Sequence, residues 1–316
     1  MRYIPWDEQR LPELVQLWNA EIGADFPMRE ELFKQNSYDE ENIVREGSFI
    51  ALNESDNIVG FVVAKCWQGD QAFQMNQEVG WIQVLLVHSA FRNIGIGSAL
   101  LLKAEQVLKE KGCKKIVLGR DPGHYFPGVP LHYENTKIWF KRKGYLETEV
   151  ESDLVCHYQT DEKPELFLED IEVSLLDSEE KHEFLSFLQR CFPGRWKYEA
   201  ELYFQKGGTG REFVIFKKAN KIIGFCRIND SNSPLIGPNV YWAPLFTEEL
   251  GGIGPLGIDQ LERKKGYGLA IVKAGISFLR ERNINHIVID WTGLVDFYKR
   301  LDYEIWKQYQ PYSKEV

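Results

Sequence analysis

The alternation of apolar and polar positions changes its period along the chain, and the same succession of periods occurs twice. Two apolar runs joined by a polar turn stand at 48–67, SFIALNESDNIVGFVVAKCW, and at 211–228, REFVIFKKANKIIGFCRI. Short apolar runs bounded by turn residues are typical of β-strands. Each half therefore begins its main pattern with a predicted pair of strands joined by a turn.

A third strand and an amphipathic helix are predicted after each pair. Apolar residues recur every three or four positions from Ile96 to Leu108 and again from Leu269 to Leu279. This period is that of one face of an α-helix. Additional helices at 12–20 and 178–190 are expected to precede the two patterns.

A short apolar strand is predicted after each amphipathic helix, at 114–119 (KKIVLG) and at 286–291 (HIVIDW). Another helix and a terminal strand follow, within WFKRKGYLE at 139–147 and FYKRLDYEI at 297–305. The predicted order is strand, strand, strand, helix, strand, helix, strand, and it is found twice.

The two copies coincide best at a glycine segment between the third strand and the helix. Both carry the spacing Arg-x-x-Gly-x-Gly, which matches Arg92 with Arg263, Gly95 with Gly266 and Gly97 with Gly268. Internal repetition at half the chain length indicates two domains of one fold. We expect domains at 1–160 and 161–316, joined by the polar stretch QTDEKPE at 159–165.

A glycine segment at the start of a helix suits a bound pyrophosphate. Free backbone amides and the positive end of the helix dipole both favour an anion there. The spacing is not GxGxxG, and no parallel βαβ unit is expected around it, which argues against a dinucleotide-binding fingerprint. No GK[ST] follows either, so the segment is not a P-loop.

Composition narrows the possible partners. The 316 residues include 38 Lys and Arg and 47 Asp and Glu, for a net charge of −9. An acidic chain without a basic block is poorly suited to nonspecific nucleic-acid binding. No apolar run approaches the roughly 20 residues that span a bilayer, and the first ten residues lack the apolar core of a signal peptide. We expect neither nucleic acid nor membrane as a partner.

The cysteines are odd in number and scattered, which predicts neither a disulfide framework nor a metal site. They are Cys66, Cys113, Cys156, Cys191 and Cys226. A reducing compartment, the cytoplasm, is the expected location.

Two motifs, each present twice and in the same order, carry a resemblance to a known family. The segments RNIGIG and RKKGYG resemble the acetyl-CoA loop of the GCN5-related N-acetyltransferases (GNAT). The segments WFKRKGY and FYKRLDY resemble the later helix and final strand of that family. The resemblance implies an α/β (α+β) fold of two tandem GNAT domains, each with a mixed, mostly antiparallel sheet flanked by helices.

The resemblance also implies the residues that hold acetyl-CoA. In the family, the strand before the glycine loop offers an amide to the thioester carbonyl, and the loop amides hold the pyrophosphate. The matching residues in the second half are Leu256, Gly257, Ile258, Arg263, Lys264, Lys265, Gly266, Tyr267 and Gly268. Those in the first half are Leu85, Leu86, Val87, Arg92, Asn93, Ile94, Gly95, Ile96, Gly97 and Ser98.

The resemblance implies a general acid only in the second half. Tyr298 occupies the position of the family's catalytic tyrosine, whereas Phe140 occupies it in the first half. Asp290 ends a predicted strand where the substrate should arrive, so it is either a group that accepts the amine proton or a capping or solvated carboxylate. Asp302 replaces the family's glycine before Tyr303, which should change a turn and not the chemistry.

The first half contains an insertion, RDPGHYFPGVPLHYENT at 120–136, rich in proline and aromatic residues. Such a loop suits a substrate lid or a contact between domains, and it resembles one in acetyltransferases of amino-sugar metabolism. Its candidate substrate residues are Asp121, His124, Tyr125 and Tyr133. A purely structural loop is an equally open interpretation.

The leading hypothesis is an N-acetyltransferase that acts on a small primary amine, for which an amino sugar such as glucosamine is one candidate. Three alternatives remain open. The acceptor could be a peptide or protein amine, or the chain could be a nonenzymatic acyl-CoA-binding module. In the third, the first domain performs the chemistry, with His88, His124 or Tyr133 in place of the missing tyrosine.

Overall fold

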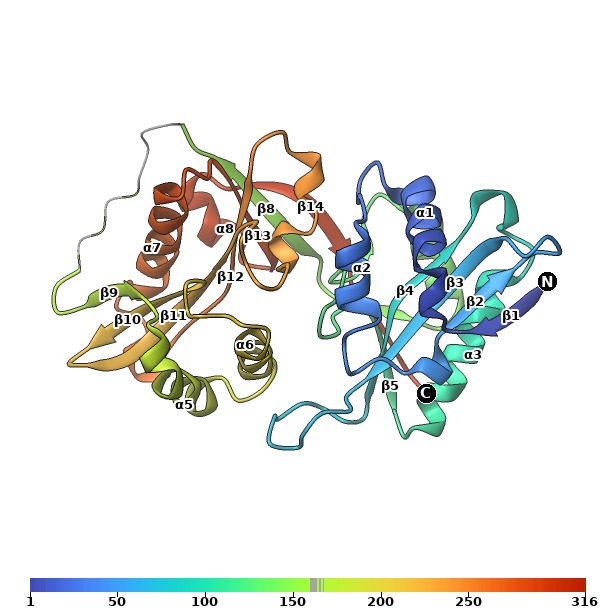
Figure 1. Ribbon diagram of the computed structural model, residues 1–316, viewed down its shortest axis with the longest axis horizontal. Coiled ribbons are helices and arrows are strands. Elements are labelled where there is room, and N and C mark those ends of the chain that lie inside the picture. Colours follow the sequence, from blue (N-terminus) through green and yellow to red (C-terminus); the bar gives the residue numbers. More distant parts are fainter. Residues whose placement is uncertain (160–163, 165, 167) are drawn as a thin grey trace. The chain divides into compact units, whose positions relative to one another are not determined.

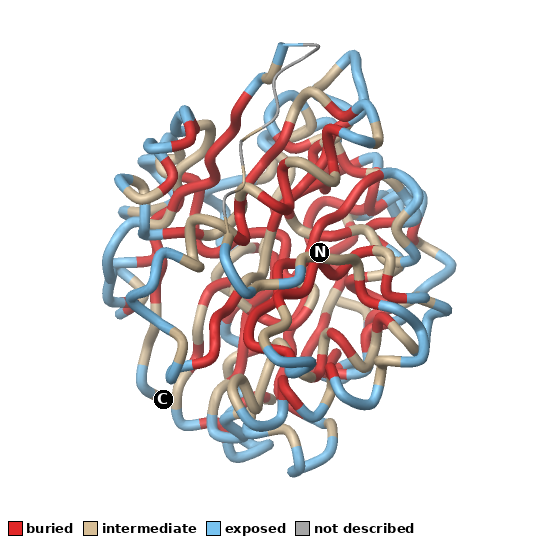
Figure 2. The backbone as a smooth tube through the Cα atoms, turned by 90° about the vertical axis from the view of Figure 1, so that its left-hand side faces the viewer, coloured by how far each residue is buried: buried red, intermediate tan, exposed pale blue. Residues whose placement is uncertain are grey.

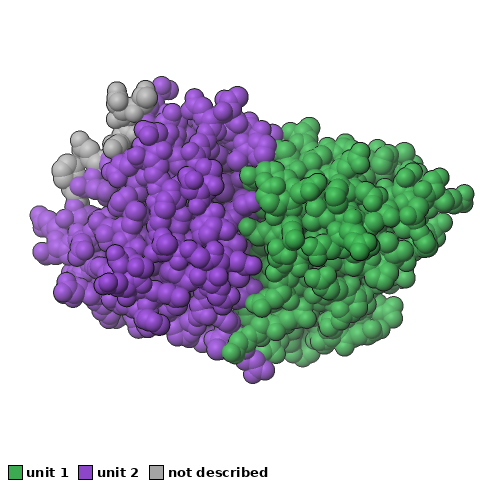
Figure 3. Space-filling view, in the orientation of Figure 1, with its two compact units in different colours: residues 1–70, 75–151, 307–316 green, residues 71–74, 152–306 purple. Residues whose placement is uncertain are grey.

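The computed structural model describes all residues except 160–163, 165 and 167, so most of the predicted linker at 159–165 lies outside the described residues. The contacts divide the chain into two compact units (Figure 3). Unit 1 consists of residues 1–70, 75–151 and 307–316, and unit 2 of residues 71–74 and 152–306.

Unit 1 is built on a sheet with the strand order β1–β2–β3–β4–β5–β15–β7 (Figure 1). The strands are β1 (Arg2–Pro5), β2 (Phe49–Leu52), β3 (Ile58–Cys66), β4 (Val79–Val87), β5 (Lys115–Leu118), β7 (Leu146–Glu147) and β15 (Tyr312–Glu315). The helices are α1 (Leu11–Ile22), α2 (Glu30–Ser37), α3 (Ile96–Glu110) and α4 (Glu134–Arg142).

The second sheet has the order β6–β14–β8–β13–β12–β11–β10–β9. Its strands are β6 (Val129–Pro130), β8 (Glu151–His157), β9 (Glu172–Leu175), β10 (Phe213–Lys218), β11 (Lys221–Asn229), β12 (Leu250–Ile258), β13 (His286–Thr292) and β14 (Glu304–Gln310). The helices of unit 2 are α5 (Lys181–Cys191), α6 (Arg195–Gln205), α7 (Tyr267–Glu281) and α8 (Val295–Tyr298).

Both sheets are mixed and mostly antiparallel, as expected. The exceptions are β4 with β5 and β12 with β13, which pair in parallel. The helices α3 and α7 connect these parallel pairs, because a parallel connection needs a crossover. The glycine segments therefore do lie in parallel βαβ units, contrary to the expectation, although their spacing remains different from GxGxxG.

The last strand of each half lies in the sheet of the other half. β8 pairs with β13, and β15 inserts between β5 and β7. Among the described residues, the division thus differs from a single boundary at 160/161 in three segments, 71–74, 152–159 and 307–316. Residues 152–156 of β8 are all buried, so this strand requires neighbours on both edges and both faces, which the second sheet provides.

The predicted helical faces form the cores of the two units. In unit 1, α3 packs against β3 and β4 with Leu100, Ala104 and Leu108 fully buried. In unit 2, α7 packs against β11 and β12 with Val272 and Ile276 fully buried. Figure 2 shows the buried stretches gathered toward the inside and the exposed ones toward the outside. Each half thus holds its glycine segment between a packed strand and a packed helix.

Candidate active site

The parallel strands β12 and β13 separate in the middle of unit 2. Their last paired residues are Ile253 and Ile289. At the next positions, Gly254 and Pro255, the register of β12 against β11 shifts, which is a β-bulge. The segment Leu256–Ile258 then pairs with β11 alone. Its other edge faces away from β11 without a strand partner among the described residues, so its backbone groups can bind a ligand.

The glycine loop of unit 2 follows this open edge. Gly266 begins α7 with φ 83° and no side-chain cap, and Lys264 also has a left-handed φ of 65°. The Arg263 Nε donates to the carbonyl of Ile258 at 3.1 Å, which ties the loop to the end of β12. Arg263, Lys264 and Lys265 are exposed. Arg263 has no ion-pair partner among the described residues, so its charge is available to an anion at the helix start.

The glycine loop of unit 1 has the same backbone and a different charge balance. Gly95 begins α3 with φ 95°, and Asn93 has φ 64°. The Arg92 Nε donates to the Val87 carbonyl at 2.9 Å, as in the second loop. The Arg92 guanidinium, however, also pairs with Glu21 at 2.5 Å. A neighbouring carboxylate weakens the attraction of this loop for an anion.

Asp290 lies where β13 departs from β12. The register of β13 with β8 shifts between Ile289 and Thr292, and Trp291 within this bulge has a φ of 43°. A left-handed conformation is rare for a bulky residue and costs free energy. The amide of Trp291 donates to Asp153 Oδ1 at 2.9 Å, which helps to hold the bulge. Asp290 therefore lies within this bulge, between the last regular pair of β13 and Thr292.

The surroundings of Asp290 shift the pKa of its carboxyl group. Burial raises the pKa of this carboxyl to about 7, and the negative charge of Asp153 adds to the effect. A hydrogen bond from Asn239 Nδ2 at 2.9 Å opposes it by stabilising the carboxylate. A carboxyl with a pKa of about 7 is partly ionised at neutral pH and can exchange protons with a substrate there.

Tyr298 lies at the end of α8 in the core of unit 2. It is buried, and its ring centroid is 4.9 Å from that of Phe297 and 6.3 Å from that of Tyr303. Burial raises the pKa of the phenol, and the charges of Cys226 and Asp290 raise it further. The hydroxyl has no hydrogen-bond partner among the described residues. Tyr298 therefore keeps its proton at neutral pH and is close enough to Asp290 to respond to its charge.

The corresponding position in unit 1 is filled by another part of the chain. The last parallel pair there is Ile82 with Leu118, so Gly119 is the counterpart of Asp290. Gly119 has φ 66°, and a Cβ on it would lie 2.0 Å from the Phe126 carbonyl oxygen. No side chain can be accommodated at this position. The Tyr298 counterpart, Phe140, is also buried and has no proton to donate.

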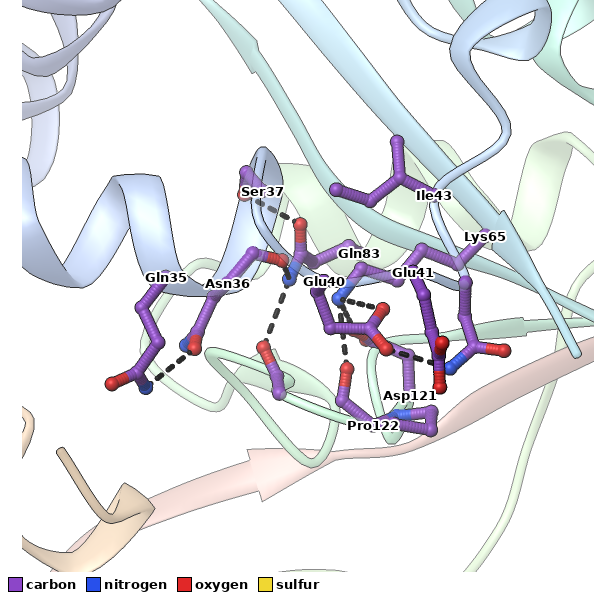
Figure 4. Close-up of polar contacts among 12 residues, drawn as sticks. Gln35, Asn36, Ser37, Glu40, Glu41, Ile43, Lys65, Gln83, Asp121 and Pro122 are labelled. Carbon is purple, nitrogen blue, oxygen red and sulfur yellow. Dashed lines mark hydrogen bonds and ion pairs between the residues drawn. The ribbon is translucent and has the colours of Figure 1, made fainter. Parts of the chain in front are cut away.

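The insertion 120–136 takes part in a buried polar network of unit 1 (Figure 4). Lys65, on β3, binds Asp121 at 2.8 Å, Glu40 at 3.2 Å and the Pro122 carbonyl at 2.8 Å. Gln83, at the β4 bulge, accepts from Ser37 and donates to the carbonyls of Asn36 and Gly123. These contacts join the insertion to α2 and to the strands.

The four candidate substrate residues of the insertion differ in burial. Asp121, His124 and Tyr125 are buried. The Tyr125 ring lies 5.0 Å from that of Trp18, edge to face. Tyr133 is half-buried, and burial raises its pKa to about 12. Within unit 1 these contacts favour the structural interpretation of the insertion over a lid.

The family model that matches this chain is that of the acetyltransferase (GNAT) family, over residues 11–132 and 181–303. The chain belongs to the GNAT family. Both matched segments contain a glycine loop. Comparison with curated proteins gives no match.

Solved structures of GNAT proteins are similar over the whole chain. One, described as a GCN5-related glucosamine N-acetyltransferase region in a fungal multi-domain GH3 β-N-acetylglucosaminidase, has a TM-score of 0.87 at 23% identity. It matches 99% of this chain, which spans 38% of the length of that protein. A GCN5-related N-acetyltransferase from Sphaerobacter thermophilus has a TM-score of 0.73 at 13% identity, with 99% and 95% of the two chains matched.

A tandem GNAT protein from the clavulanic acid biosynthesis pathway is also similar. Its TM-score is 0.68 at 12% identity, and the match covers 99% of this chain and 98% of that chain. At such identities the likeness concerns the fold. It confirms two GNAT domains in tandem.

Several residues around Asp290 had no signal in the sequence. Asn239, Asn229 and Asp153 come from a turn and two strands far apart in the chain, and only the folded sheet brings them together. Within the described residues, no group of three or more His, Cys, Asp or Glu side chains is arranged to hold a metal ion. Nor does that part of the chain include a helix long and apolar enough to cross a membrane.

Proposed function

We propose that this GNAT protein transfers the acetyl group of acetyl-CoA to the primary amine of a small molecule, and that unit 2 performs the reaction. The proposal rests on the half-buried carboxylate of Asp290, whose pKa of about 7 suits proton transfer at neutral pH. Asp290 stands where β12 and β13 separate, next to the open edge of Leu256–Ile258. Unit 1 has a glycine at the corresponding position.

The residues of unit 2 fit acetyl-CoA, which supplies an activated acetyl group as a thioester. The amides at the start of α7 and the exposed Arg263, Lys264 and Lys265 would hold its phosphates. An amide on the open edge of Leu256–Ile258 would donate to the thioester carbonyl and stabilise negative charge on its oxygen. These are the positions that the family resemblance implies.

Asp290 and Tyr298 would divide the proton transfers. The amine nitrogen forms a bond with the carbonyl carbon, and the bond from that carbon to sulfur breaks. An acceptor that binds as an ammonium first gives one proton to Asp290, which leaves a neutral amine to attack. Tyr298 donates its proton to the departing thiolate, and the resulting phenolate takes the second proton that the nitrogen releases. The raised pKa makes Asp290 a stronger base. It keeps Tyr298 protonated until the thiolate forms, but it also makes the phenol a weaker acid, so the transfer depends on the charge that develops on the sulfur.

The charges around Asp290 favour a cationic acceptor. Asp153 and Glu199 both act on the Asp290 carboxyl electrostatically, and like charges together attract an ammonium group. An amino sugar such as glucosamine is our preferred acceptor. The support for it is this cluster of carboxylates together with the likeness to a structure described as a glucosamine N-acetyltransferase region.

The test is CoA release from acetyl-CoA with a panel of amines: glucosamine, a glucosaminide, a polyamine, an aminoglycoside and lysine peptides. The Tyr298→Phe variant should lower kcat by about 10²-fold or more if the phenol donates the proton. Tyr303→Phe is the matched control. It removes a hydroxyl from the same core, 6.3 Å away between ring centroids, and should leave kcat unchanged.

The outcome of the amine panel distinguishes the proposed function from its alternatives. Turnover of glucosamine that falls in Tyr298→Phe but not in Tyr303→Phe supports the proposal. Turnover confined to lysine peptides would favour a protein acceptor. Turnover unaffected by Tyr298→Phe would contradict the role of Tyr298. Tight acetyl-CoA binding without turnover of any amine would favour the nonenzymatic binding module.

A further inference from the structure

A chain of three buried polar side chains, two of them on β11, leads to Asp290. Arg227 Nε donates to Asn229 Oδ1 at 3.2 Å, and Asn229 Nδ2 donates to Asn239 Oδ1 at 3.0 Å. Asn239 Nδ2 then donates to Asp290 Oδ1 at 2.9 Å. Arg227 is 6% exposed, Asn229 0% and Asn239 1%, so water does not compete for these bonds. We call these three residues and Asp290 the Asn relay.

The direction of the Asn relay is set at its first residue. An arginine has only donors, so the Asn229 side chain must present its oxygen to Arg227 and its nitrogen to Asn239. Asn239 must then present its nitrogen to Asp290. Successive hydrogen bonds in a buried chain polarise one another, which strengthens the last bond to the carboxylate. Through this polarisation, the positive charge of Arg227 helps to stabilise the negative charge on the Asp290 carboxylate.

Three glycines leave the space that the Asn relay occupies. A Cβ at Gly252 would lie 2.0 Å from Asn239 Oδ1, and one at Gly237 would lie 2.7 Å from the Asn229 amide nitrogen. A Cβ at Gly254 would lie 3.3 Å from Asp290 Oδ1. The glycines at 252 and 237 cannot be replaced without displacing the relay. Two of the three lie inside β12, where glycine weakens a strand unless a close approach requires it.

We propose that Asn239 and Asn229 are positioning residues for the proposed acetyl transfer, fixing the orientation of the Asp290 carboxylate and favouring its ionised form. Asn239 contacts the carboxylate, and Asn229 acts through Asn239. This inference rests on the proposed function for the role of Asp290. The effect of the relay on the carboxyl group can be measured without any turnover.

Other groups face Asp290 and must be separated from the effect of the relay. Asp153 on β8 and Glu199 on α6 raise the pKa of the Asp290 carboxyl, and the phenol of Tyr298 on α8 is near it. Arg195 Nε binds Glu199 at 2.6 Å and reduces the influence of that charge. Changes at Asn239 or Asn229 leave all of these groups in place.

The decisive measurement is the pKa of Asp290 itself. The protein with ¹³C-labelled aspartate carboxyls is titrated by NMR, and Asp290→Asn assigns the signal. Asn239→Leu removes the donor to the carboxylate and should raise the pKa by about one unit. Asn229→Leu should raise it in the same direction by less. With Asp290 less ionised, kcat/KM at pH 7 should fall about fivefold in Asn239→Leu.

A double-mutant cycle tests whether the two asparagines act as one chain. In the variant with both leucines, the pKa shift should be smaller than the sum of the single shifts, because the first change already breaks the chain. Asn36→Leu in unit 1 is the matched control. It replaces a buried asparagine of unit 1, 1% exposed, whose described bonds are with Gln35 and Gln83, and it should leave the pKa of Asp290 unchanged.

The outcomes distinguish the relay from the proposed function. Unchanged Asp290 titration in Asn239→Leu and Asn229→Leu would overturn the relay, whatever the activity of Asp290→Asn. A shifted titration together with full activity of Asp290→Asn would retain the relay and contradict the role of Asp290 as base. If the leucine variants do not fold, Asn239→Ser and Asn229→Ala give the same comparison with smaller side chains.

Discussion

The two glycine loops of this GNAT chain have nearly the same backbone, but the parallel strands that follow their helices, β5 and β13, continue into different residues. Gly95 and Gly266 both begin their helices in a left-handed conformation, with φ 95° and 83°. After the last parallel pair, however, unit 2 presents Asp290 and unit 1 presents Gly119. The same glycine loop is therefore accompanied by different residues at the end of the neighbouring strand. The two halves differ in the residue that follows the last parallel pair.

The second difference lies on the antiparallel neighbour of each glycine-loop strand, β3 in unit 1 and β11 in unit 2. It is found one residue after the position that pairs with the last parallel residue. Ala64 pairs with the last parallel position of β4, and Ile228 with that of β12, so Lys65 corresponds to Asn229. A buried lysine needs carboxylate partners, which the insertion supplies through Asp121. A neutral asparagine leaves room for a relay to Asp290. In unit 1 the polar groups hold the insertion, whereas in unit 2 they hold the candidate carboxylate.

Among the variants that test the difference between the units, Gly119→Ala should have the largest effect, which is on the free energy of unfolding. Alanine in the left-handed conformation and the contact with the Phe126 carbonyl should together lower the free energy of unfolding by about 3 kcal/mol. Denaturant unfolding measures this loss. Gly112→Ala is the control, since Gly112 has φ 90° and nothing within 4 Å of an added Cβ. Equal losses in the two variants would contradict the close packing of the insertion on Gly119.

The next effect concerns the affinity of the two loops for acetyl-CoA. Arg263→Gln should weaken binding about tenfold, because an unpaired guanidinium beside a phosphate is lost. Arg92→Gln should change the affinity little, since Arg92 already pairs with Glu21. Isothermal titration of both variants gives the comparison. A greater loss in Arg92→Gln would move the main binding site to unit 1.

The smallest effect is at the turn before the last strands. Asp302 has φ 60°, and its counterpart Gly144 has φ 87°, so aspartate keeps the left-handed turn that was expected to change. Asp302→Gly should raise the free energy of unfolding by up to about 1 kcal/mol, because glycine adopts this conformation without steric cost. The reciprocal Gly144→Asp should lower it by a similar amount. Thermal unfolding of both variants tests the pair, and no change in either would contradict the cost assigned to the turn.

The order of elements could be predicted because each has a local pattern. The apolar face from Ile96 to Leu108 needs only its own period to predict a helix, and α3 begins at Ile96. The exchange of β8 and β15 could not be predicted, since a strand's pattern does not specify which sheet it joins. The parallel pairing of β4 with β5 was missed for the same reason.

The candidate site divides in the same way. The family resemblance pointed to Tyr298 and Asp290, and the glycine spacing pointed to the loops. The Asn relay could not be predicted from the sequence, because Asn229 and Asn239 meet Asp290 only through the register of three segments. The glycines at 252 and 254 inside β12 indicate a close approach only once the structure shows that Asn239 and Asp290 lie against them.

The central claim is that Asp290 in unit 2 accepts the proton of the amine. The measurement that tests it most directly is the pH dependence of kcat/KM for the best amine, in wild type and in Asp290→Asn. Since the ionised form is the base and its pKa is about 7, kcat/KM should rise through pH 7 in wild type. In Asp290→Asn this rise should be absent and kcat about 10²–10⁴-fold lower. An unchanged profile with full activity in Asp290→Asn would contradict the claim.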